Sequence, residues 1–173
     1  MPEYSSEVGR NFVEKVCSLL DGKYGFHVFQ TSYQAADAVS VPVGEEIIRF
    51  DILLYQKRIE STQNPREKKV YFYCECKWRA NPNDLKGELR DFLIKALKAS
   101  PALQRTYADN FAFMFVCNKP FDVDQGNLQD VTYLTQFLGD EFQISDLTYL
   151  SSKVGILFLT DWFLETTTQG SLS

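Results

Sequence analysis

Three residues with the chemistry of a hydrolytic site, Asp51, Glu75 and Lys77, each lie inside a short apolar segment of the chain. The segment 70–78 is typical of a β-strand, in which successive side chains point to opposite faces. Glu75 and Lys77 therefore share one face of this strand, and Cys76 between them takes the other. A carboxylate and an ammonium group are thereby presented side by side.

The segment 46–55 contains neither Gly nor Pro, and it predicts a single strand with Asp51 near its middle. Arg49 would then lie on the same face as Asp51, because residues two apart in a strand point the same way. Both segments are too apolar for surface ribbons, so the charged side chains are expected on a buried sheet. A buried charge without a partner shifts its pKa or must be neutralised.

A bound cation would neutralise this pair of carboxylates. Asp51, Glu75 and the backbone carbonyl of Cys76 offer hard oxygen ligands of the kind that hold Mg²⁺ or Mn²⁺ with several waters retained. Lys77 could orient or help to deprotonate a metal-bound water, or neutralise charge that builds on a phosphate. The alternative is a structural Asp–Lys or Glu–Lys pair at a sheet end, because this spacing also occurs by chance.

The order of the segments resembles the PD-(D/E)XK superfamily, which has the restriction-endonuclease-like fold. A strand with Asp51, a turn-rich loop, a strand with Glu75 and Lys77, and a helix over about 84–99 follow one another. Further segments resemble the first helix, a later core strand, and the closing strand and helix of the branch that includes type IV restriction enzymes: 9–20, 111–118 and 154–164.

The resemblance implies an α/β fold with a central mixed sheet flanked by helices. It implies one nuclease-like domain over residues 1–168, with 169–173 as a flexible end or linker. It further implies a Mg²⁺- or Mn²⁺-dependent phosphodiesterase that acts on DNA, since the resembling enzymes mostly cut DNA. Such a nuclease is expected as a homodimer or as a subunit of a larger assembly, for instance in restriction or antiviral defence.

The chain departs from the family pattern at two places. Phe50 stands where the family has a proline before the aspartate, which leaves the chemistry intact. Relatives often place Glu directly after the aromatic residue of the first helix, where this chain has Val13, with Glu14 one step later and Glu7 earlier. One residue rotates a helix by about 100°, so Glu14 reaches the site only if the helix is rolled. Glu14 is a candidate to bind a second metal ion or to support the metal ligands. The alternative is that Glu14 is a solvated surface residue.

Net charge is distributed unevenly along the chain. The overall value is −5, but residues 1–119 carry 17 Lys or Arg against 15 Asp or Glu, whereas residues 120–173 carry one against eight. The part with the candidate site is therefore slightly basic. Four cations flank the site strands and could follow a phosphate backbone: Arg66, Lys68, Lys69 and Arg79.

An ordinary solvated hairpin and helix face would have the same cations, and this interpretation is favoured for Lys95 and Lys98. Two other functions share the expected fold. One is a catalytically inactive interaction or scaffold domain, supported by a pI near 4.9, an apolar flap around residues 39–43 and the acidic last third. The other is a Holliday-junction resolvase, which would be expected to have a more basic surface.

Composition sets further bounds. With 173 residues, 45% hydrophobic and 14% aromatic, the chain can bury a proper core. It contains neither an 18-residue apolar stretch nor a signal-peptide pattern, so we expect a soluble cytoplasmic protein without a membrane span. Four cysteines in apolar segments predict reduced, buried thiols. With His27 as the only histidine and no CxxC pair, zinc binding and histidine catalysis are disfavoured.

The remaining elements follow from periodicity and turn signals. We expect a first helix over 6–20, an outer strand over 26–31, a flap or edge hairpin within 33–45, a loop over 61–67, and a helix over 128–138 with Asn127 as its cap.

Overall fold

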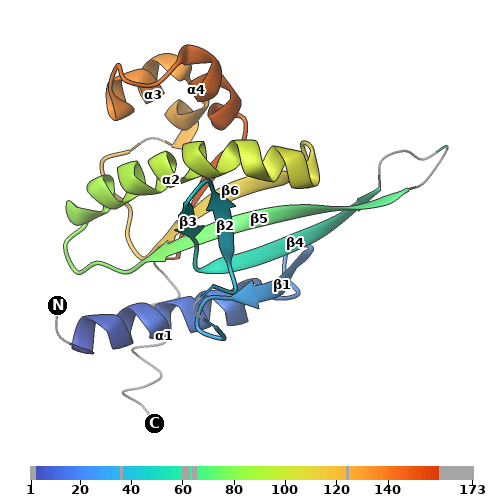
Figure 1. Ribbon diagram of the computed structural model, residues 1–173. Coiled ribbons are helices and arrows are strands. Elements are labelled where there is room, and N and C mark those ends of the chain that lie inside the picture. Colours follow the sequence, from blue (N-terminus) through green and yellow to red (C-terminus); the bar gives the residue numbers. More distant parts are fainter. Residues whose placement is uncertain (1–2, 36, 60–62, 64–65, 124, 160–173) are drawn as a thin grey trace, which may run out of the picture.

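The computed structural model describes residues 3–35, 37–59, 63, 66–123 and 125–159. Within these residues, five segments rich in aromatic and β-branched side chains form a central sheet (Figure 1). Their order across the sheet is β1 (Phe26–Thr31), β4 (Ile52–Ile59), β5 (Glu67–Lys77), β6 (Phe111–Cys117) and β7 (Val154–Phe158). The β1–β4 and β4–β5 pairs are antiparallel, whereas β5–β6 and β6–β7 are parallel.

The helix α1 (Glu3–Leu20) covers one face of this sheet (Figure 1). Its apolar residues recur every three or four positions and so form one stripe. This stripe packs against the side chains of β4 and β5 that point to the same face, in a cluster that includes Phe12, Val16, Ile52, Cys74 and Cys76. Gly22, with φ +81°, follows the end of the helix.

The helix α2 (Asp84–Tyr107) covers the opposite face and connects β5 to the parallel strand β6. Leu85, Leu89, Phe92 and Leu93 form its buried stripe. The helix continues beyond the predicted end at residue 99. Beyond α2 lie α3 (Val131–Leu138) and α4 (Ile144–Ser151), which contact each other and α2. The expected α/β class, with a mixed sheet flanked by helices, is confirmed.

The prediction of one strand over 46–55 is wrong. β3 (Glu46–Arg49) pairs with β2 (Ser40–Val43) in a separate two-stranded sheet, and β4 begins only at Ile52. Between them the backbone changes partners, because the Phe50 N–H donates to the Val39 carbonyl and the Asp51 N–H to the Cys74 carbonyl, both over 2.9 Å. The Phe50 side chain, 1% exposed, is buried against α2 at this point. Arg49 therefore does not share a strand face with Asp51.

The expected flap is the β2–β3 hairpin, whose turn contains Gly44 with φ +61°. It is not an exposed apolar surface. Val39, Val41 and Ile48 are between 2% and 4% exposed and belong to the core beneath α2. The flap therefore does not support the hypothesis of an interaction domain.

Two other boundaries differ from expectation. A 3₁₀ helix, η1 (Gln125–Gln129), precedes α3, and the N-cap is Asp130 rather than Asn127, since Asp130 Oδ1 accepts from the Thr132 N–H over 2.9 Å. The helix α4 was not anticipated. Several expectations fall outside the described residues, namely most of the loop over 61–67, the closing helix up to 164 and the end at 169–173.

Each of the four cysteines is buried with a free thiol, as expected. No helix in the described part of the chain has the length and apolar character needed to cross a membrane.

Substitution of Phe50 tests this packing, because the Phe50 ring contacts Tyr73, Phe92 and Phe113. We predict that Phe50→Ala lowers the free energy of unfolding by about 3–5 kcal/mol, through lost burial and the cavity left behind. Urea denaturation measures this loss. Tyr24→Ala, at an aromatic residue that is 82% exposed, should change stability by less than about 0.5 kcal/mol. Equal effects of the two substitutions would contradict the prediction.

Candidate active site

Asp51 lies in the irregular junction between β3 and β4, where its backbone is fixed on both sides. Its N–H donates to the Cys74 carbonyl and its carbonyl accepts from the Ser32 N–H, both over 2.9 Å. The side chain is oriented as well, because Oδ2 accepts from the backbone N–H of Cys76 over 2.8 Å. Asp51 is therefore joined directly to the middle of the Glu75-Cys76-Lys77 segment.

Glu75 points to the α2 face of β5, and Cys76 packs on the α1 face, as the strand alternation predicts. Glu75 is 7% exposed, and its Oε2 lies 2.5 Å from the Nζ of Lys95 on α2. The same Nζ lies 4.8 Å from the centre of the Phe50 ring. The expectation that Lys95 is solvated is wrong, because it provides the countercharge for a buried carboxylate.

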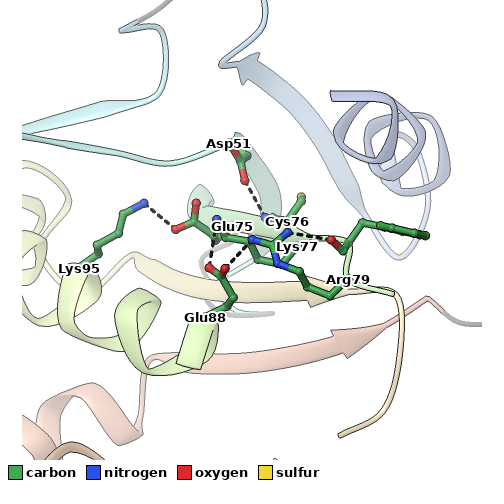
Figure 2. Close-up of polar contacts among 8 residues, drawn as sticks. Asp51, Glu75, Cys76, Lys77, Arg79, Glu88 and Lys95 are labelled. Atoms are coloured by element: carbon green, nitrogen blue, oxygen red, sulfur yellow. Dashed lines mark hydrogen bonds and ion pairs between the residues drawn. The ribbon is translucent and has the colours of Figure 1, made fainter. Parts of the chain in front are cut away.

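Lys77 is held by a second carboxylate of α2. Its Nζ lies 3.4 Å from Glu88 Oε2, and the guanidinium of Arg79 lies 2.5 Å from Glu88 Oε1. Figure 2 shows Lys77 and Arg79 converging on Glu88, while Glu75 is directed toward Lys95. Burial by itself would raise the pKa of Glu88, but the hydrogen bond from Arg79 and the two cations hold it below its usual value.

A cleft of about 410 Å³ opens beside these residues. Its walls include Asp51, Lys77 and Arg79 from the end of the sheet, and Gly9, Arg10 and Val13 from α1. Glu75 is not part of the wall. Among the described residues that line the cleft, three are cations and one is a carboxylate, so the cleft favours an anionic ligand.

Asp51 is the carboxylate with the strongest perturbation. Burial, followed by the charge of Glu75, raises its pKa from 3.8 to about 6, although the Cys76 N–H, Lys77 and Lys95 act in the opposite direction. Burial and the like charge of Glu75 both disfavour the ionised form of Asp51, and a nearby positive charge would favour it. A structural ion pair with a well-matched partner would lower the pKa instead.

The donor set fits a hard divalent cation in part. In the described residues, no three Asp, Glu, His or Cys side chains gather closely enough to hold a metal by themselves. Mg²⁺ accepts fewer protein ligands and keeps several waters, so Asp51 and the Cys76 carbonyl remain suitable oxygen donors, whereas Glu75 would have to exchange its contact with Lys95 for the metal. Burial raises the pKa of the Cys76 thiol well above its usual value, so the sulfur is not a thiolate ligand.

Glu14 is not brought into the cleft. Its Oε1 lies 3.4 Å from Nε of Arg10, and its side chain is 43% exposed. Val13, one residue earlier, lines the cleft in its place, as expected for a helix that is not rolled. Glu7 is likewise exposed.

The structure separates the four cations that were expected to contact nucleic acid. Arg79 lines the cleft, whereas Arg66, Lys68 and Lys69 lie toward the outer end of the β4–β5 hairpin. Eight residues of strand separate Lys69 from Lys77, which corresponds to about 26 Å. These cations therefore belong to two surfaces.

Sequence reasoning missed three residues around the site: Arg10, Glu88 and Lys95. Glu88 and Lys95 are seven residues apart on one helix, so two turns bring them to the same side. That spacing, opposite a strand with Glu75 and Lys77, is the signal that could have identified them. Arg10 lies three residues before Val13 and so faces the same cleft.

No protein-family model matches this sequence, and no significantly similar curated protein is found. The functional assignment therefore depends on the geometry of the site and on the resemblance of its motif.

The raised pKa of Asp51 predicts the pH dependence of stability. The folded pKa of about 6 exceeds the ordinary 3.8, so the folded protein binds more protons than the unfolded chain between these values. Stability is then lost as the pH rises from about 4 to about 7, because the ionised carboxylate is disfavoured in the fold. Asp51→Asn keeps an oxygen for the Cys76 N–H without the charge.

In the presence of a metal chelator and above pH 7, the free energy of unfolding of Asp51→Asn should exceed that of wild type by about 2–3 kcal/mol. The difference should vanish near pH 4. Urea denaturation across this pH range measures it. A constant difference between the two proteins would contradict the raised pKa.

Proposed function

We propose that this protein is a Mg²⁺- or Mn²⁺-dependent phosphodiesterase that cleaves nucleic acid, with DNA as the expected substrate. The observation that carries the proposal is the hydrogen bond from the Cys76 N–H to Asp51. It joins the two motif segments at one end of the sheet, beside a cationic cleft. A carboxylate pair, a lysine and a cleft lined by cations are suited to metal-assisted phosphodiester hydrolysis.

The arrangement of the elements supports a restriction-endonuclease-like fold. The order α1, β1, β4, β5, α2 and β6, with Asp51 immediately before β4 and Glu75 and Lys77 near the end of β5, is the order expected from the PD-(D/E)XK resemblance. The β2–β3 hairpin is an insertion between β1 and β4.

Asp51, Glu75 and the Cys76 carbonyl would hold the metal, which would supply charge neutralisation at a phosphate oxygen and a more acidic water. Lys77 contributes a fixed positive charge at the wall of the cleft. Glu88 lies 3.4 Å from this ammonium group and restricts its position. A preorganised cation of this kind stabilises the charge that builds on the phosphate during hydrolysis.

Arg10 and Arg79 position the substrate. They line the cleft from α1 and from the end of β5, respectively. Arg79 is held by Glu88 and by the Trp78 carbonyl, so its planar guanidinium is ordered before a phosphate arrives. Recognition of a specific target would come from a second copy of the chain or from a partner in a restriction or antiviral defence assembly.

A catalytically inactive interaction domain is the second candidate, and one observation favours it. Glu75 is paired with Lys95, and Lys77 with Glu88, so these motif charges are compensated within the protein. Such pairs give a scaffold a structural reason to keep the motif. The raised pKa of Asp51 remains unexplained by that function, and the response to metal distinguishes the two.

The first test of the proposal is cleavage. We predict that Asp51→Asn, Glu75→Gln and Lys77→Met each reduce the cleavage rate by about a hundredfold or more, because charge stabilisation and water activation are lost. Linear, circular and single-stranded substrates in Mg²⁺, Mn²⁺ or EDTA provide the assay. Lys98→Met is the matched control, since Lys98 is 50% exposed and contacts Glu46 on β3. Full activity of any of the three variants would remove that residue from the site.

The second test is metal linkage. Mg²⁺ or Mn²⁺ at about a hundred times its dissociation constant should stabilise wild type by about 2.7 kcal/mol, and Asp51→Asn by much less. Thermal unfolding with and without metal measures this difference. Asp37→Asn, at an exposed carboxylate paired with Arg49, should respond as wild type does. An identical response of wild type and Asp51→Asn would favour the interaction domain.

A further inference from the structure

A row of aromatic rings lies on the α2 face of the central sheet, away from the candidate active site. It consists of Phe29 on β1, Tyr55 on β4, Tyr71 on β5 and Tyr107 at the end of α2. Neighbouring ring centres are 6.2 Å apart for Phe29 and Tyr55, 6.4 Å for Tyr55 and Tyr71, and 4.5 Å for the stacked pair Tyr71 and Tyr107. We name this row the aromatic row.

The outer end of the row is open to solvent. Phe29 is 53% exposed, Tyr55 is half-buried, and His27 beside them is also exposed, with its ring 5.2 Å from that of Tyr55. The last residue of α2, Tyr107, stacks on Tyr71 at the other end of the row. Figure 1 shows β4 and β5 extending beyond the helices. The Phe29 ring is therefore the most exposed member of the row, and it contacts Tyr55 and Tyr71 on its protein side.

Cations surround the exposed end of the row. In the β4–β5 ladder, Lys57 is directly opposite Lys69, and Arg58 is directly opposite Lys68. Like charges in directly opposite positions destabilise a sheet. Glu67 lies 3.3 Å from Lys57. Residues 56–70 carry five Lys or Arg against two Glu, so this part of the sequence has an excess of positive charge.

The cations and the rings are parts of one surface. Lys69 Nζ lies 4.8 Å from the centre of the Tyr55 ring, and Lys57 and Lys69 share the strand face of Tyr55 and Tyr71 by alternation. A second cleft of about 350 Å³ is lined by Lys57, Arg58, Ile59 and Glu67. A ligand that matches this surface must combine flat apolar groups with regularly spaced negative charges.

We propose that the aromatic row and its cations bind an unpaired strand of nucleic acid, with a base on the exposed ring of Phe29 and phosphates at Lys57 and Lys69. Aromatic stacking beside a cationic track is how proteins hold single strands without reading sequence. A duplex hides the faces of its bases inside the stack, so it offers only phosphates to this surface. The proposal rests on the proposed function in taking nucleic acid as the substrate, and it adds that the substrate has a single-stranded part.

The row is separate from the catalytic cleft. Tyr71 precedes Glu75 by four residues on the same face of β5, or about 13 Å. Phe50 packs against Tyr73 between them, and the β2–β3 hairpin covers this stretch with α2. Binding at the row can therefore be measured without disturbing Asp51, Glu75 or Lys77.

The test measures fluorescence anisotropy of the full chain in EDTA, where metal-dependent cleavage is absent. The probes are a labelled deoxythymidine oligomer of about 12 nucleotides, the equivalent RNA, and a duplex of similar length. Phe29→Leu should weaken single-strand binding about tenfold or more, because a stacked base is lost. Phe29→Trp should retain it, and duplex affinity should change less than about twofold in both variants.

Two further variants separate stacking from charge. Tyr24→Leu removes an aromatic residue that is 82% exposed but lies outside the row, and it should leave binding unchanged. The double substitution Lys57→Gln and Lys69→Gln should reduce the slope of log affinity against log salt by about 1.4, at about 0.7 for each phosphate contact on a single strand.

Unchanged single-strand affinity in Phe29→Leu overturns the proposal, as does an equal loss for single strand and duplex. It is also overturned if sedimentation shows a wild-type dimer that Phe29→Leu dissociates while neither protein binds the single strand, because the row is then an interface between copies. A protein that binds single strands through Phe29 but cuts none supports this inference and contradicts only the nuclease. A protein that cuts while Phe29→Leu binds normally contradicts only this inference.

Discussion

The change of backbone partners between Phe50 and Asp51 is the constraint on which the site depends. Phe50 still bonds to Val39, whereas Asp51 already bonds to Cys74 of the central sheet. The junction places an aromatic ring in the core under α2 and frees the next side chain from regular strand alternation. That freedom lets the Asp51 carboxylate reach the Cys76 N–H at the end of the sheet. A continuous strand would have fixed Asp51 by alternation alone.

The charges around this junction are balanced unequally. Glu88 holds Lys77 and Arg79 together, and Lys95 neutralises Glu75, so α2 supplies the matching charge for each motif residue of β5. Within the described residues, the direct hydrogen-bond donor to the Asp51 side chain is the Cys76 backbone N–H, and burial with the charge of Glu75 raises the pKa of Asp51 to about 6. The uncompensated charge of the site is therefore concentrated on one carboxylate beside the cleft, where a divalent cation would have the largest effect.

The structural features that depend on local periodicity could be predicted from the sequence. Alternation in β5 correctly separated Glu75 from Cys76, and the apolar stripes of α1 and α2 indicated the two helices that cover the sheet. The break at Phe50 was missed because no Gly or Pro marks it, and only the distant partners Val39 and Cys74 determine it. Lys95 was predicted to be solvated because it was considered alone. Its spacing of seven residues from Glu88 on α2, opposite the strand with Glu75 and Lys77, was the signal that could have placed it at the site. The metal, the activity and the substrate stay predictions.

The acidic last third of the chain has a role in this charge distribution. Lys86 and Arg90 on α2 lie 3.7 Å from Asp122 and from Glu141, respectively, so two of its acids face cations of the helix. The candidate active-site cleft and the β4–β5 hairpin lie on other parts of the fold and keep their own cations. Because charges more than about 8–10 Å apart in water are largely screened at physiological salt, a net charge of −5 does not prevent either surface from attracting a phosphate backbone. Local charge, rather than the isoelectric point, determines which ligands these two surfaces attract.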